Sequence, residues 1–142
     1  REQLKETGTT FYLKLAPVDP RSLMQGDYMR LRYAIDDELN SYLHKNDIDS
    51  TSTIIANLDE HQVATFAALD DSQALTENQI RLTVSKQSYR YEVRPDSFMF
   101  QEGHAAFYEN AQYGVFKYSV DDGHMLVGLA DADRKLIVPK DQ

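Results

Sequence analysis

Alternating apolar and polar positions run along most of the chain and predict β-strands. The clearest alternation follows Gly26. One of its faces carries the large apolar side chains Met29, Leu31, Tyr33 and Ile35. A period of two is typical of a half-buried strand, so we expect a strand over residues 27–35. The same pattern predicts a strand at residues 9–16, which ends before Pro17 and Pro20 because proline cannot donate a hydrogen bond to a sheet.

Two further regions pair two apolar runs across a short polar turn and predict hairpins, and a third region predicts two alternating strands. Residues 53–69 contain two runs joined across Asp59 and Glu60, and residues 80–95 contain two alternating runs. Residues 115–139 contain two runs around "DDG", a strong hairpin signal, followed by a possible third strand. Strands that follow one another through tight turns leave too few crossover helices for a parallel sheet.

Helical spacing is confined to three short segments, at residues 1–8, 36–45 and 97–114. In the second segment, Asp36 or Asp37 is the expected cap, and Leu39 and Leu43 stand four residues apart on one helix face. We therefore predict a single α+β domain over residues 1–142. It is mainly antiparallel β, folded as a curled or barrel-like sheet, with two or three short helices.

Composition narrows the function classes. A chain of 142 residues can bury a core of its own, and 42% hydrophobic with 27% charged residues is ordinary for a globular domain. The net charge of -8 argues against nucleic-acid binding, which needs a basic surface. With no cysteine, disulfides and thiolate chemistry are excluded.

The sequence contains no recognisable catalytic or metal-binding motif. The four histidines, His44, His61, His104 and His124, are far apart, and none forms a metal-ligating pair. Two of them follow acidic residues, in "LDEH" and "DDGH", but both motifs fall at predicted hairpin tips, where polar residues favour the turn. We therefore expect no catalytic residue, no metal and no cofactor.

Charged and aromatic residues gather around the stretch "DPRSLMQGDYMRLRY", residues 19–33. Arginine–aspartate pairs there would hold the turn against the sheet, or an arginine-rich face would receive an acidic ligand or a partner's carboxylates. Tyrosine-rich strands are typical of a carbohydrate or peptide platform, but ordinary cross-strand packing of aromatic pairs is the use that we expect. The candidate binding residues are Asp19, Arg21, Asp27, Tyr28, Arg30, Arg32, Tyr33, Arg94 and Glu102.

The octapeptide "GDYMRLRY" resembles the signature of the bacterial GDYXXLXY family. Its five signature positions are Gly26, Asp27, Tyr28, Leu31 and Tyr33. The resemblance extends upstream through "LAPVDPRSLMQ" and downstream through "FMFQEGHAAFYENAQYGVFKYSVDDGHMLVGLAD". It implies the extracytoplasmic domain of a membrane-anchored bacterial protein, on the periplasmic face of the inner membrane. A first residue of arginine, not methionine, agrees with an anchor removed from this chain. The family supplies no catalytic residues.

Three functions follow as hypotheses. The leading one is a binding or assembly module that contacts a protein partner at the membrane. An alternative is a hydrolase or lyase that uses carboxylates and a tyrosine, namely Asp19, Asp27, Glu102 and Tyr28. It requires these groups to converge on one pocket. A further alternative is a small-ligand barrel lined by tyrosine and phenylalanine, which requires a sizeable closed cavity.

Overall fold

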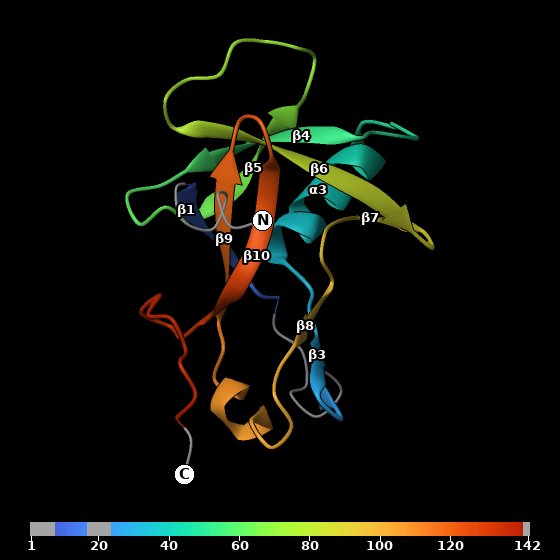
Figure 1. Ribbon diagram of the computed structural model, residues 1–142. Coiled ribbons are helices and arrows are strands. Elements are labelled where there is room, and N and C mark those ends of the chain that lie inside the picture. Colours follow the sequence, from blue (N-terminus) through green and yellow to red (C-terminus); the bar gives the residue numbers. More distant parts are fainter. Residues whose placement is uncertain (1–7, 17–23, 141–142) are drawn as a thin grey trace.

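The computed structural model describes residues 8–16 and 24–140 and shows a mainly antiparallel β fold (Figure 1). Its described elements, in chain order, are β1 (Thr9–Lys14), β2 (Met24–Gln25), β3 (Tyr28–Arg30), α3 (Ala34–Lys45), β4 (Thr53–Leu58), β5 (Ala64–Leu69), β6 (Gln79–Gln87), β7 (Arg90–Val93), β8 (Ser97–Met99), the 3₁₀ helix η1 (Ala105–Tyr108), β9 (Tyr113–Ser119) and β10 (Gly123–Ala130). The strand predicted at residues 9–16 is confirmed as β1, which ends at Lys14, and the two predicted hairpins are confirmed as β4–β5 and β9–β10. The two strands predicted over residues 80–95 are β6 and β7, which pair with each other.

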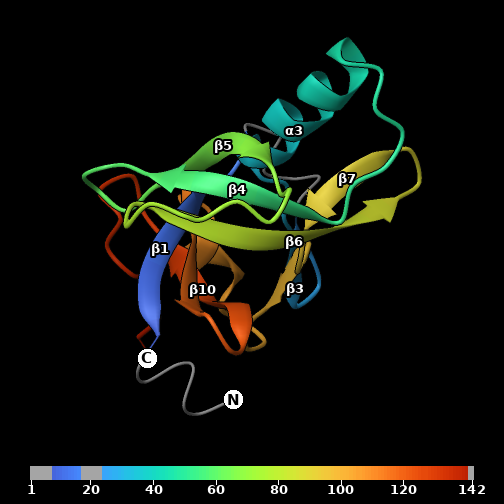
Figure 2. The same cartoon turned by 90° about the horizontal axis from the view of Figure 1, so that it is seen from above.

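The described strands form three antiparallel sheets. The front sheet has the order β1-β9-β10, the lower sheet β2-β3-β8 and the upper sheet β5-β4-β6-β7. Strands of the front sheet run across those of the upper sheet (Figures 1 and 2). A single parallel bridge between Tyr12 and Val63 joins the front sheet to the start of β5, and the Tyr12 N–H donates to the Gln62 carbonyl at 2.9 Å.

Helix α3 lies against both outer strands of the upper sheet, which therefore curls around it. On one side the Glu38 carboxylate accepts the N–H of Phe66 in β5 at 3.2 Å. On the other side the Asn40 amide accepts the N–H of Tyr91 in β7 at 3.0 Å and donates to its carbonyl at 2.8 Å. Polar side chains of the helix thus cover the exposed backbone of both edge strands, which protects a sheet against pairing with other chains.

The core where the front sheet meets α3 is aromatic. The rings of Phe11 and Phe116 stack with centroids 5.1 Å apart, and Tyr33 meets Phe116 edge-on at 5.7 Å. Gly114 makes this packing possible, because a Cβ there would lie 3.1 to 3.3 Å from the side chains of Phe116, Leu126 and Tyr33. A side chain at this position would push the aromatic rings apart.

The predicted strand over residues 27–35 is much shorter in the structure. Only Tyr28–Arg30 pair as β3, against the three-residue strand β8, and the helix already begins at Ala34. Burial still alternates beyond the strand, because the Arg32 carbonyl accepts the Ala16 N–H at 2.7 Å and keeps the chain extended. The alternation correctly identified the buried face but overestimated the length of the ladder.

The prediction of two or three helices was slightly too high. Within residues 8–16 and 24–140 the structure has one α-helix, α3, and one 3₁₀ turn, η1. The segment at 97–114 is the strand β8 followed by η1, and Ala105, Tyr108 and Ala111 recur every three residues, which is the period of a 3₁₀ helix. The helix predicted at residues 1–8 falls almost wholly outside the described residues.

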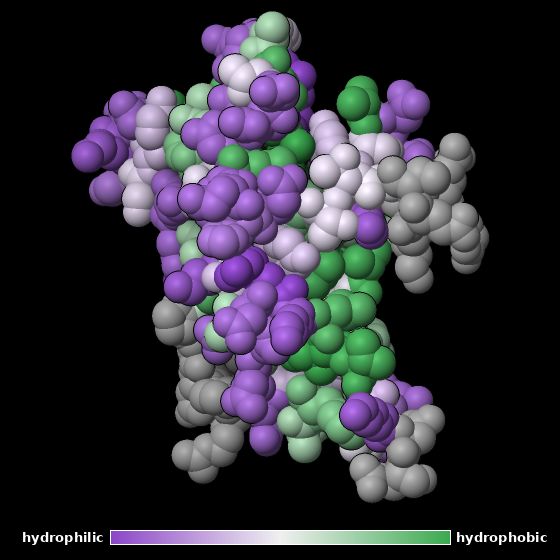
Figure 3. All heavy atoms as spheres, turned by 90° about the vertical axis from the view of Figure 1, so that its left-hand side faces the viewer, coloured by the Kyte–Doolittle hydropathy of each residue, from purple (hydrophilic) through white to green (hydrophobic). Residues whose placement is uncertain are grey.

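The surface of the domain is divided between polar and apolar areas. Figure 3 shows a largely hydrophilic upper half on one side of the molecule and an apolar area in its lower half. The C-terminal segment 131–140 lies on the left-hand side in Figure 1, which is the side that Figure 3 shows, and it carries the exposed side chains of Leu136 and Val138. Among the described residues, no helix combines the length and the apolar character needed to span a lipid bilayer.

Candidate functional site

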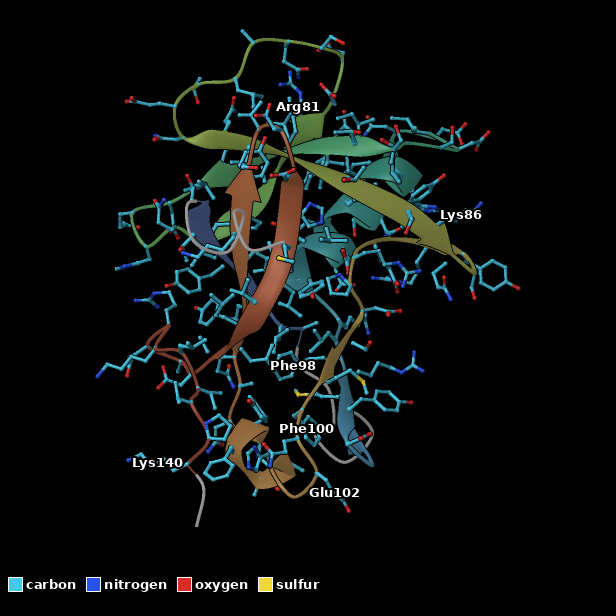
Figure 4. All side chains as sticks on the ribbon, viewed as in Figure 1. Arg81, Lys86, Phe98, Phe100, Glu102 and Lys140 are labelled. Atoms are coloured by element: carbon cyan, nitrogen blue, oxygen red, sulfur yellow. The ribbon has the colours of Figure 1, made fainter. Side chains whose placement is uncertain are left out.

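The structure describes seven of the nine candidate binding residues and places them on several elements of the domain. Asp19 and Arg21 lie outside the described residues. Asp27 stands in the exposed turn between β2 and β3, and Glu102 stands in the exposed turn after β8. Figure 4 shows Glu102 at the lower end of the molecule, and the Asp27 carbonyl accepts the Phe100 N–H at 3.0 Å, so the turns that carry Asp27 and Glu102 lie on neighbouring segments. Neither Asp27 nor Glu102 lines one of the two grooves described below, so the structure offers no support for the hydrolase hypothesis.

Tyr33, the last signature residue, is a structural hydrogen-bond donor. Its side chain is fully buried, and its hydroxyl donates to the Pro95 carbonyl at 2.7 Å. Burial raises the pKa of the Tyr33 phenol far above its ordinary value, and the carboxylates of Asp36 and Asp96 add to the effect. The phenol therefore stays protonated, and it joins the start of α3 to the segment that follows β7.

Arg32, one of the arginines predicted to form a binding face, is engaged within the domain, as is Arg90 of β7. The guanidinium groups of Arg32 and Arg90 both lie 2.8 Å from Oδ1 of Asp37 on α3. Although burial alone would raise the pKa of Asp37, its hydrogen bonds to the two arginines lower that pKa below its usual value. These pairs join β7 and the segment after β3 to the helix, so they act as structural clamps, one of the two uses predicted for them.

Arg94 is held by three partners. Its guanidinium lies 2.7 Å from Oδ2 of Asp96 and donates to Ser85 at 3.0 Å and Gln87 at 2.6 Å. Arg30, by contrast, is exposed on β3. The remaining candidate, Tyr28, is half-buried on the same strand, where it pairs with Met99 of β8.

A buried carboxylate that the sequence reasoning treated as a helix cap is the most unusual polar group in the core. Asp36 is only 2% exposed. Its Oδ1 accepts the N–H of Val93 in β7 at 2.9 Å, and its Oδ2 accepts the N–H of Tyr33, the true N-cap, at 3.4 Å. Burial raises the pKa of Asp36 to about 7, although the two N–H groups oppose the shift. The sequence held one signal: Asp36 shares a helix face with the buried Leu39 and Leu43.

The larger of the two grooves runs beside strand β10 and has a volume of about 550 Å³. We call it the β10 groove. It is lined by Thr83, Arg94, Pro95, Asp122, Gly123, His124, Met125 and Leu126. Of the seven candidate binding residues that the structure describes, only Arg94 lines it. One wall is β10 itself, and the other is the segment Arg94–Pro95.

His124 is the central polar side chain of the β10 groove. Its Nε2 lies 3.1 Å from the Arg94 carbonyl, so Nε2 carries the proton and donates, because a carbonyl oxygen only accepts. Its ring meets Phe116 edge-on, with centroids 5.9 Å apart. Burial lowers the pKa of His124 below its usual value, and the hydrogen bond to Arg94 only partly opposes this. The imidazole is therefore neutral at neutral pH.

The sequence predicted His124 at a solvated hairpin tip, but in the structure His124 is the second residue of strand β10. The tip is formed by residues 120–122, whereas His124 is already in β10, opposite Tyr118 of β9. It lies two residues before Leu126, which packs against the core. Because alternate residues of a strand share a face, the spacing of His124 and Leu126 was the available signal.

A second, smaller groove of about 200 Å³ lies between the end of α3 and the β6–β7 hairpin. It is lined by Asn40, Leu43, His44, Ile48, Asp49, Lys86, Tyr89 and Tyr91. The Lys86 ammonium lies 5.9 Å from the centre of the Tyr91 ring, within reach of a cation–π contact. Asn40 is already committed to the backbone of Tyr91. Two polar side chains that line this groove, Asn40 and Lys86, therefore already have partners within the domain.

The aromatic residues pack mainly on one another. Besides the Phe11–Phe116 and Tyr33–Phe116 contacts, Tyr108 packs against Phe98 at 5.1 Å and Phe100 at 5.6 Å between ring centres. Tyr12 meets Tyr113 at 6.3 Å on the front sheet. Ordinary packing thus accounts for these rings, and the two grooves open to the surface instead of forming a barrel interior.

Comparison with known proteins identifies the family alone. A family model described as GDYXXLXY protein matches residues 1–129, which confirms the resemblance seen in the octapeptide. No curated protein and no solved structure matches the chain.

Proposed function

The chain belongs to the GDYXXLXY family, and from this premise we propose that its domain is a binding or assembly module that docks another protein in the β10 groove. The single observation that carries this proposal is the groove itself. Its volume of about 550 Å³ falls within the range of roughly 300 to 1,000 Å³ typical of ligand-binding clefts. Apolar Pro95, Met125 and Leu126 stand beside polar His124 and Arg94, a mixture suited to a polypeptide partner.

The chemistry of the groove favours binding over catalysis. The protonated nitrogen of His124 is committed to the Arg94 carbonyl. A general base needs an oriented partner and a nucleophile within hydrogen-bond reach. Among the described residues that line this groove, the only hydroxyl belongs to Thr83. The same surface provides shape and hydrogen-bonding groups for recognition.

In this proposal the domain faces the periplasm from an anchor in the bacterial inner membrane, and its partner is a protein at that membrane. This setting is supported by the family resemblance, which implies the extracytoplasmic domain of a membrane-anchored protein. Fractionation of the native gene product tests the setting: it should sediment with inner membranes, and protease added to spheroplasts should degrade the domain. Survival of the domain in intact spheroplasts would contradict this location.

A substitution that fills the groove tests the binding function. Thr83 is an exposed β6 residue in the groove wall, and Thr65 is an exposed β5 residue outside it. Tryptophan is tolerated at exposed strand positions, so Thr83→Trp and Thr65→Trp form a matched pair. Cross-linking in native membranes should recover a partner with the wild type and Thr65→Trp, but not with Thr83→Trp. Equal recovery with both variants would refute the groove as the docking site.

A further inference from the structure

We infer that the partner enters the β10 groove as an extended, basic segment that pairs with the free edge of β10 as an additional β-strand. This inference rests on the proposed binding function and specifies its mode. Strand addition is a common form of peptide recognition, in which backbone hydrogen bonds provide affinity and side-chain pockets provide specificity.

The distribution of edge protection points to β10. Of the other described edge strands, β5 and β7 are covered by side chains of α3, β1 is joined to Gln62, and β2 and β8 are only two and three residues long. The far end of β10 is also covered, because the Leu129 carbonyl accepts the Ile137 N–H at 2.9 Å. Within the described part of the chain, residues 123–126 pair only with β9, so their outward N–H and C=O groups form an open template.

The length of this template is limited by a β-bulge. The register with β9 is regular from Gly123 to Leu126 and shifts between Leu126 and Gly128. A bulge bends and twists a strand and interrupts its pairing. The open edge therefore accepts a short segment and resists the continuous growth that a long flat edge would invite.

The opposite wall of the groove, Arg94–Pro95, offers the segment no regular series of backbone hydrogen-bond partners. Pro95 has no N–H, and its carbonyl already accepts the Tyr33 hydroxyl at 2.7 Å. The Arg94 carbonyl accepts His124 Nε2 at 3.1 Å. A segment in the groove therefore finds its regular series of backbone partners on β10, while its inward side chains pack on Pro95 and Leu126.

The charges around the β10 groove indicate which kind of segment would bind there. Arg94 is paired with Asp96 at 2.7 Å, and His124 is neutral, so neither contributes a free positive charge to the groove. The β9–β10 tip at its mouth carries Asp121 and Asp122, and the whole chain has a net charge of -8. Complementary potentials increase association rates and reject like-charged partners. A segment with lysine or arginine beside apolar residues fits this surface.

A synthetic peptide provides the direct test. The probe is a short, capped peptide of alternating valine and lysine, and the control alternates valine and glutamate. The lysine peptide should bind the domain at least about tenfold more tightly, and added salt should weaken it. On binding, the outward amides within residues 123–126 should become protected from hydrogen exchange.

Backbone and charge variants separate strand pairing from simple attraction. Two N-methylated versions of the lysine peptide, modified at alternate residues, keep the side chains but remove one set of donors each; at least one should lose binding. Asp121→Asn should weaken binding several-fold, whereas Glu60→Gln, at the exposed β4–β5 tip, should leave it unchanged. Peptide binding that leaves the amides of residues 123–126 unprotected would overturn strand addition.

Failure of this inference is distinguishable from failure of the proposed function. If the native partner is lost with Thr83→Trp but neither peptide binds, the groove remains a docking site and the strand model is wrong. If the lysine and glutamate peptides bind equally, the inferred preference for a positively charged segment is wrong. If sedimentation shows a dimer that the lysine peptide dissociates, the occupant is a second copy of this chain, and the basic partner is refuted.

Discussion

The carboxylate of Asp36, in the first turn of α3, accepts the backbone N–H of Val93 in β7 at 2.9 Å. This contact joins the helix to an edge strand through a group that is almost completely buried. Glu92 lies near enough to add negative potential, and one of its oxygens, Oε1, is buried without a hydrogen-bond partner. The junction between α3 and β7 therefore concentrates buried acidic groups.

The first prediction concerns pH. Burial raises the pKa of Asp36 from 3.8 to about 7 in the folded state. A raised folded pKa means that the folded state binds the proton more tightly, so its stabilising effect is complete below pH 3.8 and is lost as the pH rises to about 7. Relative to Asp36→Asn, the wild type should lose up to about 4 kcal/mol of unfolding free energy across this window.

Urea unfolding of both proteins at several pH values measures this difference. Subtracting the unfolding free energies of the two proteins at each pH cancels the contribution of every other titrating group. The lowered pKa of His124 makes the fold less stable as the pH falls below 6.5, the usual histidine value, and this affects both proteins equally. A difference between the wild type and Asp36→Asn that stays constant with pH would show that Asp36 has an ordinary pKa in the fold.

A second prediction concerns His124. Its pKa, followed by NMR titration of the ring, should lie below 6.5 because burial disfavours the imidazolium. His124→Phe should keep the ring contact with Phe116 but leave the Arg94 carbonyl without its donor. The expected cost is about 1 to 3 kcal/mol of unfolding free energy. A pKa above 6.5 would place the ring in water and contradict its position in the groove wall.

A third prediction compares two signature residues. Tyr33→Phe removes the hydroxyl that donates to the partly buried Pro95 carbonyl and should cost about 1 to 2 kcal/mol. Asp27→Ala alters an exposed turn side chain and should change stability by less than about 0.5 kcal/mol. Denaturant midpoints of the two variants give the comparison. Greater loss from Asp27→Ala would mean that this carboxylate has a structural partner of its own.

A fourth prediction concerns Gly26. Its φ of +64° lies in the left-handed region, which β-branched residues adopt only under strain. Nothing lies within 4 Å of a Cβ built at this position, so space is not the limitation. Gly26→Val should destabilise the domain by about 1 to 3 kcal/mol, and Gly26→Asn should cost clearly less, because asparagine tolerates this conformation. Equal melting temperatures of the two variants would exclude backbone strain as the cause.

The local pattern of the sequence was enough to identify most strands and the buried face of the signature. Met29, Leu31, Tyr33 and Ile35 are all buried, as their alternation predicted. The antiparallel class and the family signature also followed from the chain alone. These features depend on neighbours in sequence, whose side chains share a face whenever the backbone is extended.

Only the tertiary structure decided what lies opposite each side chain. Asp36 is a buried link because β7, far away in sequence, brings Val93 against it, and an isolated helix pattern contains no information about that neighbour. In the same way, His124 lines a groove because Arg94 follows β7 past the tip of β10. The stretch at residues 19–33 held the family signature, whereas the groove that we propose for binding is formed by β10 and the segment Arg94–Pro95, which only long-range contacts bring together.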